Sequence, residues 1–307
     1  MNNKKISVVI PVLNEISNIE LLLPRLEKVF KKLNISSEII IVDDGSRDSE
    51  IECYKKIRRN FTESRLQILI LGTNHGHQKA LEIGIKHAQG DYIVTMDGDL
   101  QDPPEFLYKL ISEIQEGNLD FVATIRASRE TSLINKFLIF LFYKIIAFLI
   151  GEKVIANSGD FRIAKKKVYE MIFRISKPYY FFRFEINKMK FKKKYLVYHQ
   201  NKRTNEIAKG RFIWYLDFAF QAIVSSSNKL HKKALLFSVI LFLLFFIFTL
   251  IFFVLFLLKK VSALILMICL VVTIVNVNTF LILLILDYIV FNHLSTSTNN
   301  VSYIRKI

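Results

Sequence analysis

Cysteine is scarce in this chain of 307 residues, which contains only Cys53 and Cys269. The two lie in regions of different character, so no disulfide framework is indicated and a reducing compartment fits the sequence. No secretory signal is expected in the first apolar run (residues 6–11), because the run is too short for one. That run is typical of a buried strand. We therefore expect the N-terminal domain to stay in the cytoplasm.

Acidic residues are outnumbered: 27 Asp and Glu stand against 43 Lys and Arg, which gives a formal net charge of +16. Such an excess favours an anionic partner, and nucleic acid, anionic lipid and a phosphorylated substrate all satisfy it. A genome composition that favours lysine would produce the same excess without any function. The basic residues are spread along the chain and adjoin an apolar segment, so nucleic acid is the weakest of these interpretations.

Charged residues are almost absent between positions 234 and 291, where Lys259 and Lys260 form the main interruption. The apolar run Ala234–Leu258 is longer than the roughly 20 residues that cross a bilayer, and a second run follows from Val261 to about Phe291. At this length only helices satisfy their backbone within lipid, so the two runs predict a transmembrane helical hairpin. The core of a soluble helical protein is the alternative, and the length of the runs disfavours it.

Basic residues set the expected orientation of this hairpin. His231, Lys232 and Lys233 precede it, and Arg305 and Lys306 follow it, so both flanks are expected on the cytoplasmic side. The expected organisation is a catalytic domain at 1–230, the hairpin at 231–291 and a cytoplasmic tail at 292–307. Asn276, Asn278 and Asp287 are tolerable in the second span if they face the partner helix or an interface.

A third apolar stretch, Phe137–Ile150, is too short to span a bilayer and carries Lys144 in its middle. It predicts a helix that lies in the membrane interface or covers the sheet. The basic run Lys188–Lys194 and the aromatic residues at 179–182 are compatible with the same interface, although the aromatic residues fit a protein core equally well.

Short apolar runs alternate with helical patterns along the first 120 residues. This order predicts an α/β domain whose mostly parallel sheet has helices on both faces. The expected strands are 6–12, 38–42, 66–71 and 92–96, and the expected helices are 18–32, 49–59, 77–88 and 105–116. Ligands bind such sheets beyond the carboxyl ends of the strands, and polar clusters occur at three of these ends.

The first cluster, Asp97-Gly98-Asp99, follows the strand 92–96. Residues two apart on an extended chain point the same way, so both carboxylates are expected to address one cation. Oxygen ligands suit Mg²⁺ or Mn²⁺, with Gln101 as a further ligand and the rest of the shell supplied by a diphosphate and water. The alternative is a solvated loop in which Asp102 caps the helix that Pro103 and Pro104 open.

The other two clusters are Asp43-Asp44 and the segment from Pro11 to Glu15. A carboxylate at Asp44 can accept the N–H of a uracil or guanine base, whereas an Asx turn that caps the next helix is the alternative. Pro11, Leu13, Asn14 and Glu15 are expected to line the nucleoside pocket, and helix capping is again the alternative.

Taken together and in order, these motifs resemble family 2 glycosyltransferases with the GT-A fold. The resemblance is carried by Val9-Ile-Pro-Val-Leu-Asn-Glu15, Val42-Asp-Asp-Gly-Ser46, Asn74-His-Gly-His-Gln-Lys-Ala80, Gly84, Ala88-Gln-Gly-Asp91 and Met96-Asp-Gly-Asp-Leu-Gln-Asp-Pro-Pro-Glu105. More narrowly, the chain is similar to the polyisoprenyl-phosphate branch, which contains dolichol-phosphate mannose synthase and bacterial bactoprenol glucosyltransferases. Its bacterial members have the same two C-terminal membrane helices, and some of them form tetramers.

The resemblance also implies roles for later residues. Asn157-Ser-Gly-Asp-Phe-Arg162 matches a G-D-F-R element that brings Asp160 and Arg162 to the acceptor site, and Arg126 matches an arginine near the diphosphate. Arg203 and Lys209 fall in a segment associated with the lipid phosphate. This sequence departs from that segment, with Glu206 for Gly and Ala208 for Ser or Thr, and Gln221-Ala222 stands where Asp-Gly is common. A second interpretation is that the basic stretch 203–211 is attracted to anionic lipid.

The expected activity is the inverting transfer of a sugar from a nucleotide-sugar, with UDP favoured over GDP, to a polyisoprenyl phosphate for cell-surface glycan modification. Asp97, Gly98 and Asp99 are expected to act on the diphosphate, while Arg162, Arg203 and Lys209 hold the acceptor phosphate. That phosphate is already largely ionised, since its second pKa is near about 6, so Asp160 is expected to orient Arg162 or the acceptor as readily as to act as a base.

Two other functions compete with this one. A processive polysaccharide synthase would carry a Q-x-x-R-W element, which Arg211-Phe-Ile-Trp214 does not match, and more membrane helices. A degenerate transferase that serves as a membrane partner is favoured by Glu206 and Ala208, but the intact Asp44, Asp97 and Asp99 disfavour it.

Overall fold

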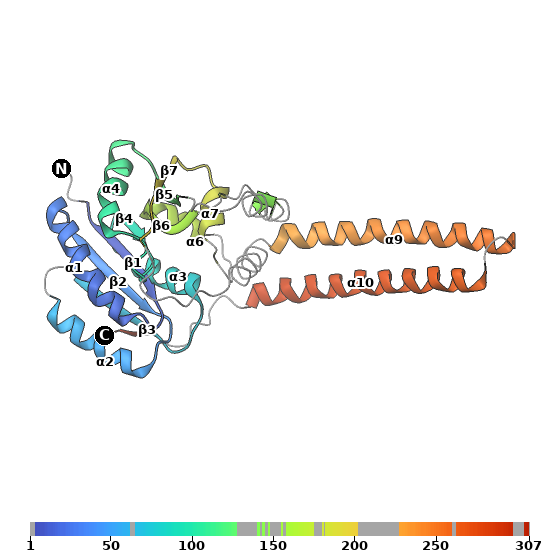
Figure 1. Cartoon of the computed structure of the whole chain (residues 1–307), viewed down its shortest axis with the longest axis horizontal. Helices are drawn as coiled ribbons and strands as arrows, with labels where there is room; N and C mark the ends of the chain where they lie inside the picture. The colour runs from blue at the N-terminus through green and yellow to red at the C-terminus, as the bar shows by residue number, and fades with distance from the viewer. Residues whose placement is uncertain are drawn as a thin grey trace.

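The computed structural model describes residues 4–61, 65–127, 158–174, 182–201, 227–259, 262–296 and 304–306, with a few isolated positions between 140 and 180. An α/β domain occupies one end of the molecule, and two long helices project from it (Figure 1). The expected segments 203–211 and 221–222 lie outside the described residues, as does most of 137–150.

A single mixed sheet organises the described part of the domain. Its strands run in the order β7-β5-β6-β4-β1-β2-β3-β8, and the central set β4-β1-β2-β3 is parallel. The antiparallel pairs are β4–β6, β5–β6 and β3–β8, while β5 and β7 are parallel. The strands are β1 Ile6–Val12, β2 Ser37–Asp43, β3 Arg65–Leu71, β4 Tyr92–Thr95, β5 Phe121–Arg126, β6 Ser158–Lys165, β7 Lys193–Tyr198 and β8 Ile304–Lys306.

Helices cover both faces of this sheet. Its central strands are continuous apolar runs because both of their faces are buried. One core packs α1, α2 and α4 against the face that carries Val8 and Ile10, and the other packs α3, α6 and α7 against the face that carries Val9. The helices of the domain are α1 Ile16–Leu33, α2 Asp48–Asn60, α3 His77–His87, the 3-10 turn η1 Pro104–Phe106, α4 Leu107–Glu116, α6 Lys166–Phe173 and α7 Phe182–Lys188.

The two projecting helices are α9, Ser227–Leu257, and α10, Ala263–Thr296. Each contains a window long and apolar enough to cross a membrane, Leu236–Leu257 and Ala263–Leu283, and neither window is buried inside the molecule. The helices lie side by side, and the hydroxyls of Thr249 and Thr273 are 2.7 Å apart across the pair. Two long, exposed apolar helices are consistent with a membrane anchor.

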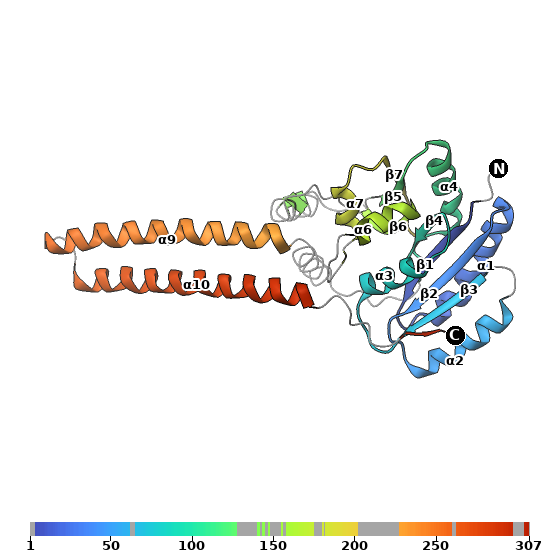
Figure 2. The ribbon, with the colours of Figure 1, turned by 180° about the vertical axis from the view of Figure 1, so that it is seen from behind.

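The C-terminus returns to the domain after the hairpin. Strand β8 pairs antiparallel with β3, with Ile304 opposite Leu71 and Lys306 opposite Leu69. Figure 2 shows the C-terminus at the sheet, far from the tip of the hairpin. Both ends of the hairpin are therefore connected to the same α/β domain.

The expected elements of the first 120 residues are confirmed to within a few residues at their ends, as is the α/β fold class with a mostly parallel sheet and two C-terminal apolar helices. Strands β5 to β8 were not among the elements expected from the apolar pattern. Tyr180 and Phe182 lie in the core, 5% and 0% exposed, which selects the core interpretation for these two aromatic residues. In the basic run, Lys193 donates to carbonyls at the end of α7, and Lys194 pairs with Glu113.

Candidate active site

Parallel pairing brings the three sequence clusters to one edge of the sheet. Strand β1 lies between β2 and β4, so the segments that follow these strands meet at their carboxyl ends. Gly98 shows how closely they meet: a Cβ at this position would lie 2.8 Å from Cγ1 of Val12 and 3.0 Å from Oε2 of Glu15. Only glycine allows this approach, and the loop that follows β4 is thereby fixed against the end of β1.

The loops after β1 and β2 are held together by hydrogen bonds. The backbone N–H of Asn14 donates to the Ser46 hydroxyl (2.8 Å), and the Arg47 N–H donates to Oδ1 of Asn14 (3.2 Å). Leu13 and Asn14 are exposed and Glu15 is half-buried, whereas Pro11 is buried within β1. Leu13 and Asn14 are thus the residues of this segment that offer side chains to a ligand.

Asp43 and Asp44 have different surroundings. Oδ1 of Asp43 accepts the N–H groups of Gly45 and Ser46, which is the Asx turn considered as the alternative for this motif. The carboxylate of Asp44 accepts the N–H groups of His75 and Gly76, each at 2.8 Å, and the residue is only 4% exposed. Burial raises the pKa of Asp44, and these two hydrogen bonds act in the opposite direction. Asp44 therefore fixes the β3–α3 loop beside the position expected for a nucleobase.

The Asp97–Asp99 segment is a turn and not an extended chain. Strand β4 ends at Thr95, and Leu100 has a left-handed backbone with φ of 63°. The alternation expected for an extended segment is therefore wrong here, and Asp97 and Asp99 have separate contacts: Arg126 lies 3.4 Å from Oδ2 of Asp97, while Oδ1 of Asp99 accepts the Gln101 N–H. Within the described ranges, no group of three or more His, Cys, Asp or Glu side chains could hold a metal.

The donor set at this turn nevertheless suits an oxygen-seeking cation. Oδ1 of Asp97 is buried without a hydrogen bond, and Nε2 of His77 lies 3.6 Å from it. Carboxylate oxygens of this kind bind Mg²⁺ or Mn²⁺ when substrate phosphates complete the shell. Asp102, directly behind the turn, is fully buried and accepts hydrogen bonds from the Tyr198 hydroxyl and the Asp97 N–H. Burial, reinforced by Asp97, raises the pKa of Asp102 to about 7.

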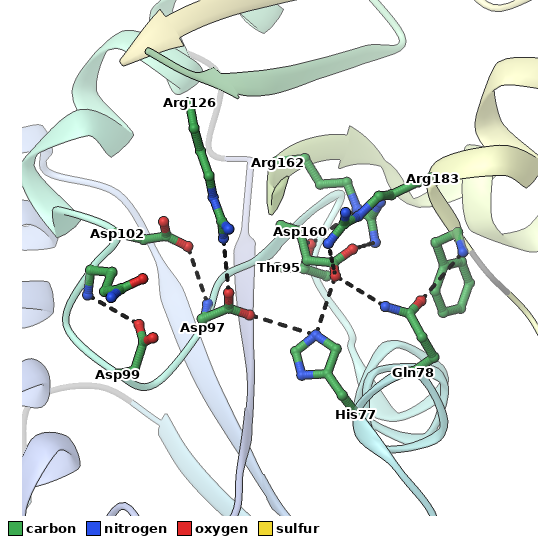
Figure 3. Close-up of polar contacts among 12 residues, drawn as sticks. His77, Gln78, Thr95, Asp97, Asp99, Asp102, Arg126, Asp160, Arg162 and Arg183 are labelled. Atoms are coloured by element: carbon green, nitrogen blue, oxygen red, sulfur yellow. Dashed lines mark hydrogen bonds and ion pairs between the residues drawn. The ribbon is translucent and has the colours of Figure 1, made fainter. Parts of the chain in front are cut away.

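Asp160 is the centre of a second polar cluster, a short distance along the same edge (Figure 3). Its Oδ2 accepts from Gln78 (3.0 Å), Arg183 (3.0 Å) and His77 (3.3 Å), and its Oδ1 lies 2.9 Å from Arg162. Burial alone would raise the pKa of Asp160, but Arg183, Arg162 and the His77 hydrogen bond hold it well below its usual range. A carboxylate with a depressed pKa is a weak base, so the surroundings favour an orienting role.

His77 connects the two clusters. Its Nε2 lies between Oδ2 of Asp160 and Oδ1 of Asp97, and its side chain is 42% exposed (Figure 3). Burial of the ring nitrogen opposes protonation, but the two carboxylates outweigh it and raise the pKa of His77. His77 therefore links the Asp97–Asp99 turn to the cluster around Asp160.

The structure brings together most of the residues expected from the sequence, in two adjacent groups. Asp97, Gly98, Asp99, Gln101 and Arg126 form one group, and Asp160 and Arg162 belong to the other. Arg203 and Lys209 lie outside the described residues.

Sequence reasoning missed four contributors: His77, Gln78, Asp102 and Arg183. The first three belong to motifs that were recognised, and their position at the end of a strand or the start of a helix could have indicated that they lie at the site. Arg183 is in no motif, and only the packing of α7 against β6 brings it to Asp160.

Comparison with known proteins relates this chain to glycosyltransferases. A family model described as Glycosyl transferase family 2 matches residues 7–173. An uncharacterized glycosyltransferase of Synechocystis sp., sll0501, is 32% identical over 73% of this chain and 70% of its own length. The undecaprenyl-phosphate 4-deoxy-4-formamido-L-arabinose transferase of Yersinia enterocolitica is 41% identical over 43% of this chain, which spans only 40% of that relative's length.

Among solved structures, glucosyl-3-phosphoglycerate synthase from Mycobacterium tuberculosis, in complex with Mn²⁺ and UDP-glucose, is similar with a TM-score of 0.48 and 17% identity. The similarity covers 74% of this chain and 79% of that one.

Proposed function

Since this chain belongs to glycosyl transferase family 2, with an α/β GT-A-like fold, we propose that it transfers a sugar from a nucleotide-sugar to a polyisoprenyl phosphate. We take the donor to be a UDP-sugar and the acceptor to be undecaprenyl phosphate at the cytoplasmic leaflet. The undecaprenyl-phosphate sugar transferase to which part of the chain is similar supports this acceptor.

One observation carries the proposal: the same chain combines the Asp97–Asp99 turn, the arginines around Asp160 and a pair of long apolar helices. The helices would hold the domain at the bilayer, where a long isoprenoid acceptor presents its phosphate. The catalytic domain corresponds to residues 1–230, the anchor to 231–291 and the tail to 292–307. In this proposal both ends of the anchor face the cytoplasm, because the chain joins the same domain at each end.

The proposed reaction is an in-line displacement with inversion at the anomeric carbon. An oxygen of the acceptor phosphate forms the new bond to that carbon, while the bond to the β-phosphate oxygen breaks and the nucleoside diphosphate leaves with its electron pair. Asp97 and Asp99, with Gln101, would hold a divalent cation that neutralises charge on the leaving group. Arg126 adds fixed positive charge beside Asp97. Leu13, Asn14, Glu15 and the loop positioned by Asp44 would receive the nucleoside.

The experiment that tests this function measures transfer from radiolabelled UDP- and GDP-sugars to undecaprenyl phosphate in detergent, with Mg²⁺, Mn²⁺ or EDTA. We expect a chloroform-soluble product that is lost with EDTA and in Asp99→Ala. The matched control is Glu116→Ala, which removes an exposed carboxylate from the end of α4 and should retain full activity. Donor binding without transfer from any sugar would contradict the proposal and favour a degenerate transferase.

A further inference from the structure

The two arginines on Asp160 differ in their access to solvent. The side chain of Arg162 is 1% exposed and that of Arg183 is 18% exposed, although both lie about 3 Å from the same carboxylate. The resemblance considered above assigns the acceptor phosphate to Arg162. Burial makes this arginine a poor candidate for direct contact with a phosphate that arrives from outside.

Arg162 lies in the core, where several groups contact its side chain. Its Nε donates to the Thr95 hydroxyl (3.2 Å), its guanidinium pairs with Oδ1 of Asp160, and its Cζ lies 5.7 Å from the centre of the Phe182 ring. Moving this guanidinium to the surface would break its ion pair with Asp160 and leave a buried carboxylate without this counter-ion, which is costly. Arg162 thus serves as a structural partner of Asp160.

Arg183 is held at the surface side of the same carboxylate. It is the second residue of α7, and the start of that helix is fixed by Gln78, whose Oε1 accepts the Phe182 N–H (3.4 Å) while its Nε2 donates to Asp160. The Phe182 ring is completely buried, stacked on Tyr180 and edge-on to Tyr169. The backbone of α7 is therefore anchored, and the guanidinium has a defined position.

Charge and location at this position suit an incoming phosphate. Arg162 and Arg183 both pair with Asp160, so two guanidinium groups lie at this one carboxylate. Helices α3, α6 and α7 lie at the end of the domain from which α9 and α10 project (Figures 1 and 2). Arg126, by contrast, contacts Asp97, on the side of the carboxylate turn.

We propose that Arg183, positioned by Asp160 and Gln78, binds the phosphate of the isoprenyl acceptor, and that Arg162 supports it from beneath without touching the substrate. This inference rests on the proposed function. Arginine suits the role because its planar fork can hold Asp160 with one edge and a phosphate with another.

The decisive experiment is a binding titration, which requires no sugar donor. Farnesyl phosphate is titrated into the full-length protein in detergent, with farnesol as the control for the isoprenoid tail. We expect phosphate-dependent binding to the wild type, a loss of about 10- to 100-fold in affinity in Arg183→Gln, and partial recovery in Arg183→Lys. Arg174→Gln removes an exposed arginine near the end of α6 and should bind like the wild type.

Kinetics then separate binding from structure. In Arg183→Gln the KM for undecaprenyl phosphate should rise by the same factor, with the KM for the nucleotide-sugar and the Tm unchanged. Arg162→Gln should instead lower the Tm. Equal binding of farnesyl phosphate by wild type and Arg183→Gln, or no phosphate-dependent binding by the wild type, would overturn the inference. Intact phosphate binding without sugar transfer from any donor would contradict the proposed function alone.

Discussion

At the residue scale, the behaviour of Asp160 depends on the charges that surround it. Its folded pKa lies well below the ordinary value of 3.8, so the carboxylate stays ionised throughout the neutral range. Its contribution to folding stability is complete above roughly pH 4 to 5 and is lost only as the pH falls through the depressed pKa. No change in its protonation is available to catalysis near neutrality.

This gives a prediction for the pH dependence of the rate. The acid limb of the wild-type profile should lie near about pH 6, where the acceptor phosphate gains a proton. Asp160→Asn should lower kcat/KM by roughly 100-fold, because Arg183 and Arg162 lose their shared partner, and should leave this limb in place. The measurement is kcat/KM from pH 5 to 9 for both proteins, with the Tm as a check on folding. Disappearance of the acid limb in the variant would show that Asp160 acts as a base.

A second prediction at this scale concerns Gly98, because a methyl group at this position would collide with Val12. Gly98→Ala should displace the Asp97–Asp99 turn from Val12 and Glu15, raise the Mn²⁺ concentration needed for half-maximal activity about tenfold, and change the Tm little. Gly98→Ser should have a larger effect in the same direction. The measurement is a metal titration of the transfer rate, and unchanged metal dependence in both variants would show that the loop can yield.

At the element scale, the C-terminal strand closes one edge of the sheet. Without β8, the N–H and C=O groups of β3 at Leu69 and Leu71 would be open to other chains. Deleting residues 304–307 should therefore speed hydrogen exchange at positions 69–71 and promote aggregation. Deletion of Ile307 alone, which leaves β8 whole, is the control. Unchanged exchange in the longer deletion would mean that this pairing adds no protection.

The hairpin depends on a contact of a different kind, since apolar side chains gain little by leaving lipid for one another. The hydroxyls of Thr249 and Thr273 form a hydrogen bond between the two helices. A double-mutant cycle with Thr249→Val and Thr273→Val should give a coupling of about 0.5 to 1 kcal/mol. Unfolding in detergent micelles measures it, and strictly additive effects of the two changes would argue against the bond.

At the scale of the whole molecule, the return of the chain to the sheet restricts the topology. If the hairpin crosses a membrane, its turn at Lys259 must lie on the opposite side from the domain. In a background with Cys53→Ser and Cys269→Ser, an impermeant maleimide added to intact cells should label Lys259→Cys. It should label Glu116→Cys only after lysis. Labelling of both positions in intact cells would contradict the proposed orientation.

Much of this organisation could be predicted from local sequence. Buried parallel strands must be apolar throughout, so β1 to β4 were recognisable, and the polar residues after them marked the edge where a ligand binds. The two apolar helices were equally clear, because length and hydropathy are properties of the chain itself. By itself the sequence thus determined the α/β class, the two long apolar helices and the polar segments that follow β1, β2 and β4.

The tertiary structure decided what those residues do. The sequence shows two arginines, Arg162 and Arg183, and does not tell which of them is exposed. Their burial differs only because α7 packs over β6, and this burial decides which arginine can meet a substrate. Beyond β4, Asp97 pairs with Arg126 whereas Asp99 accepts the Gln101 N–H, and the long-range contacts of Gln78 fix a helix more than 100 residues away. The sequence specifies the type of each side chain. Its exposure to solvent, its hydrogen-bond and ion-pair partners and its pKa are set by residues that are distant in sequence.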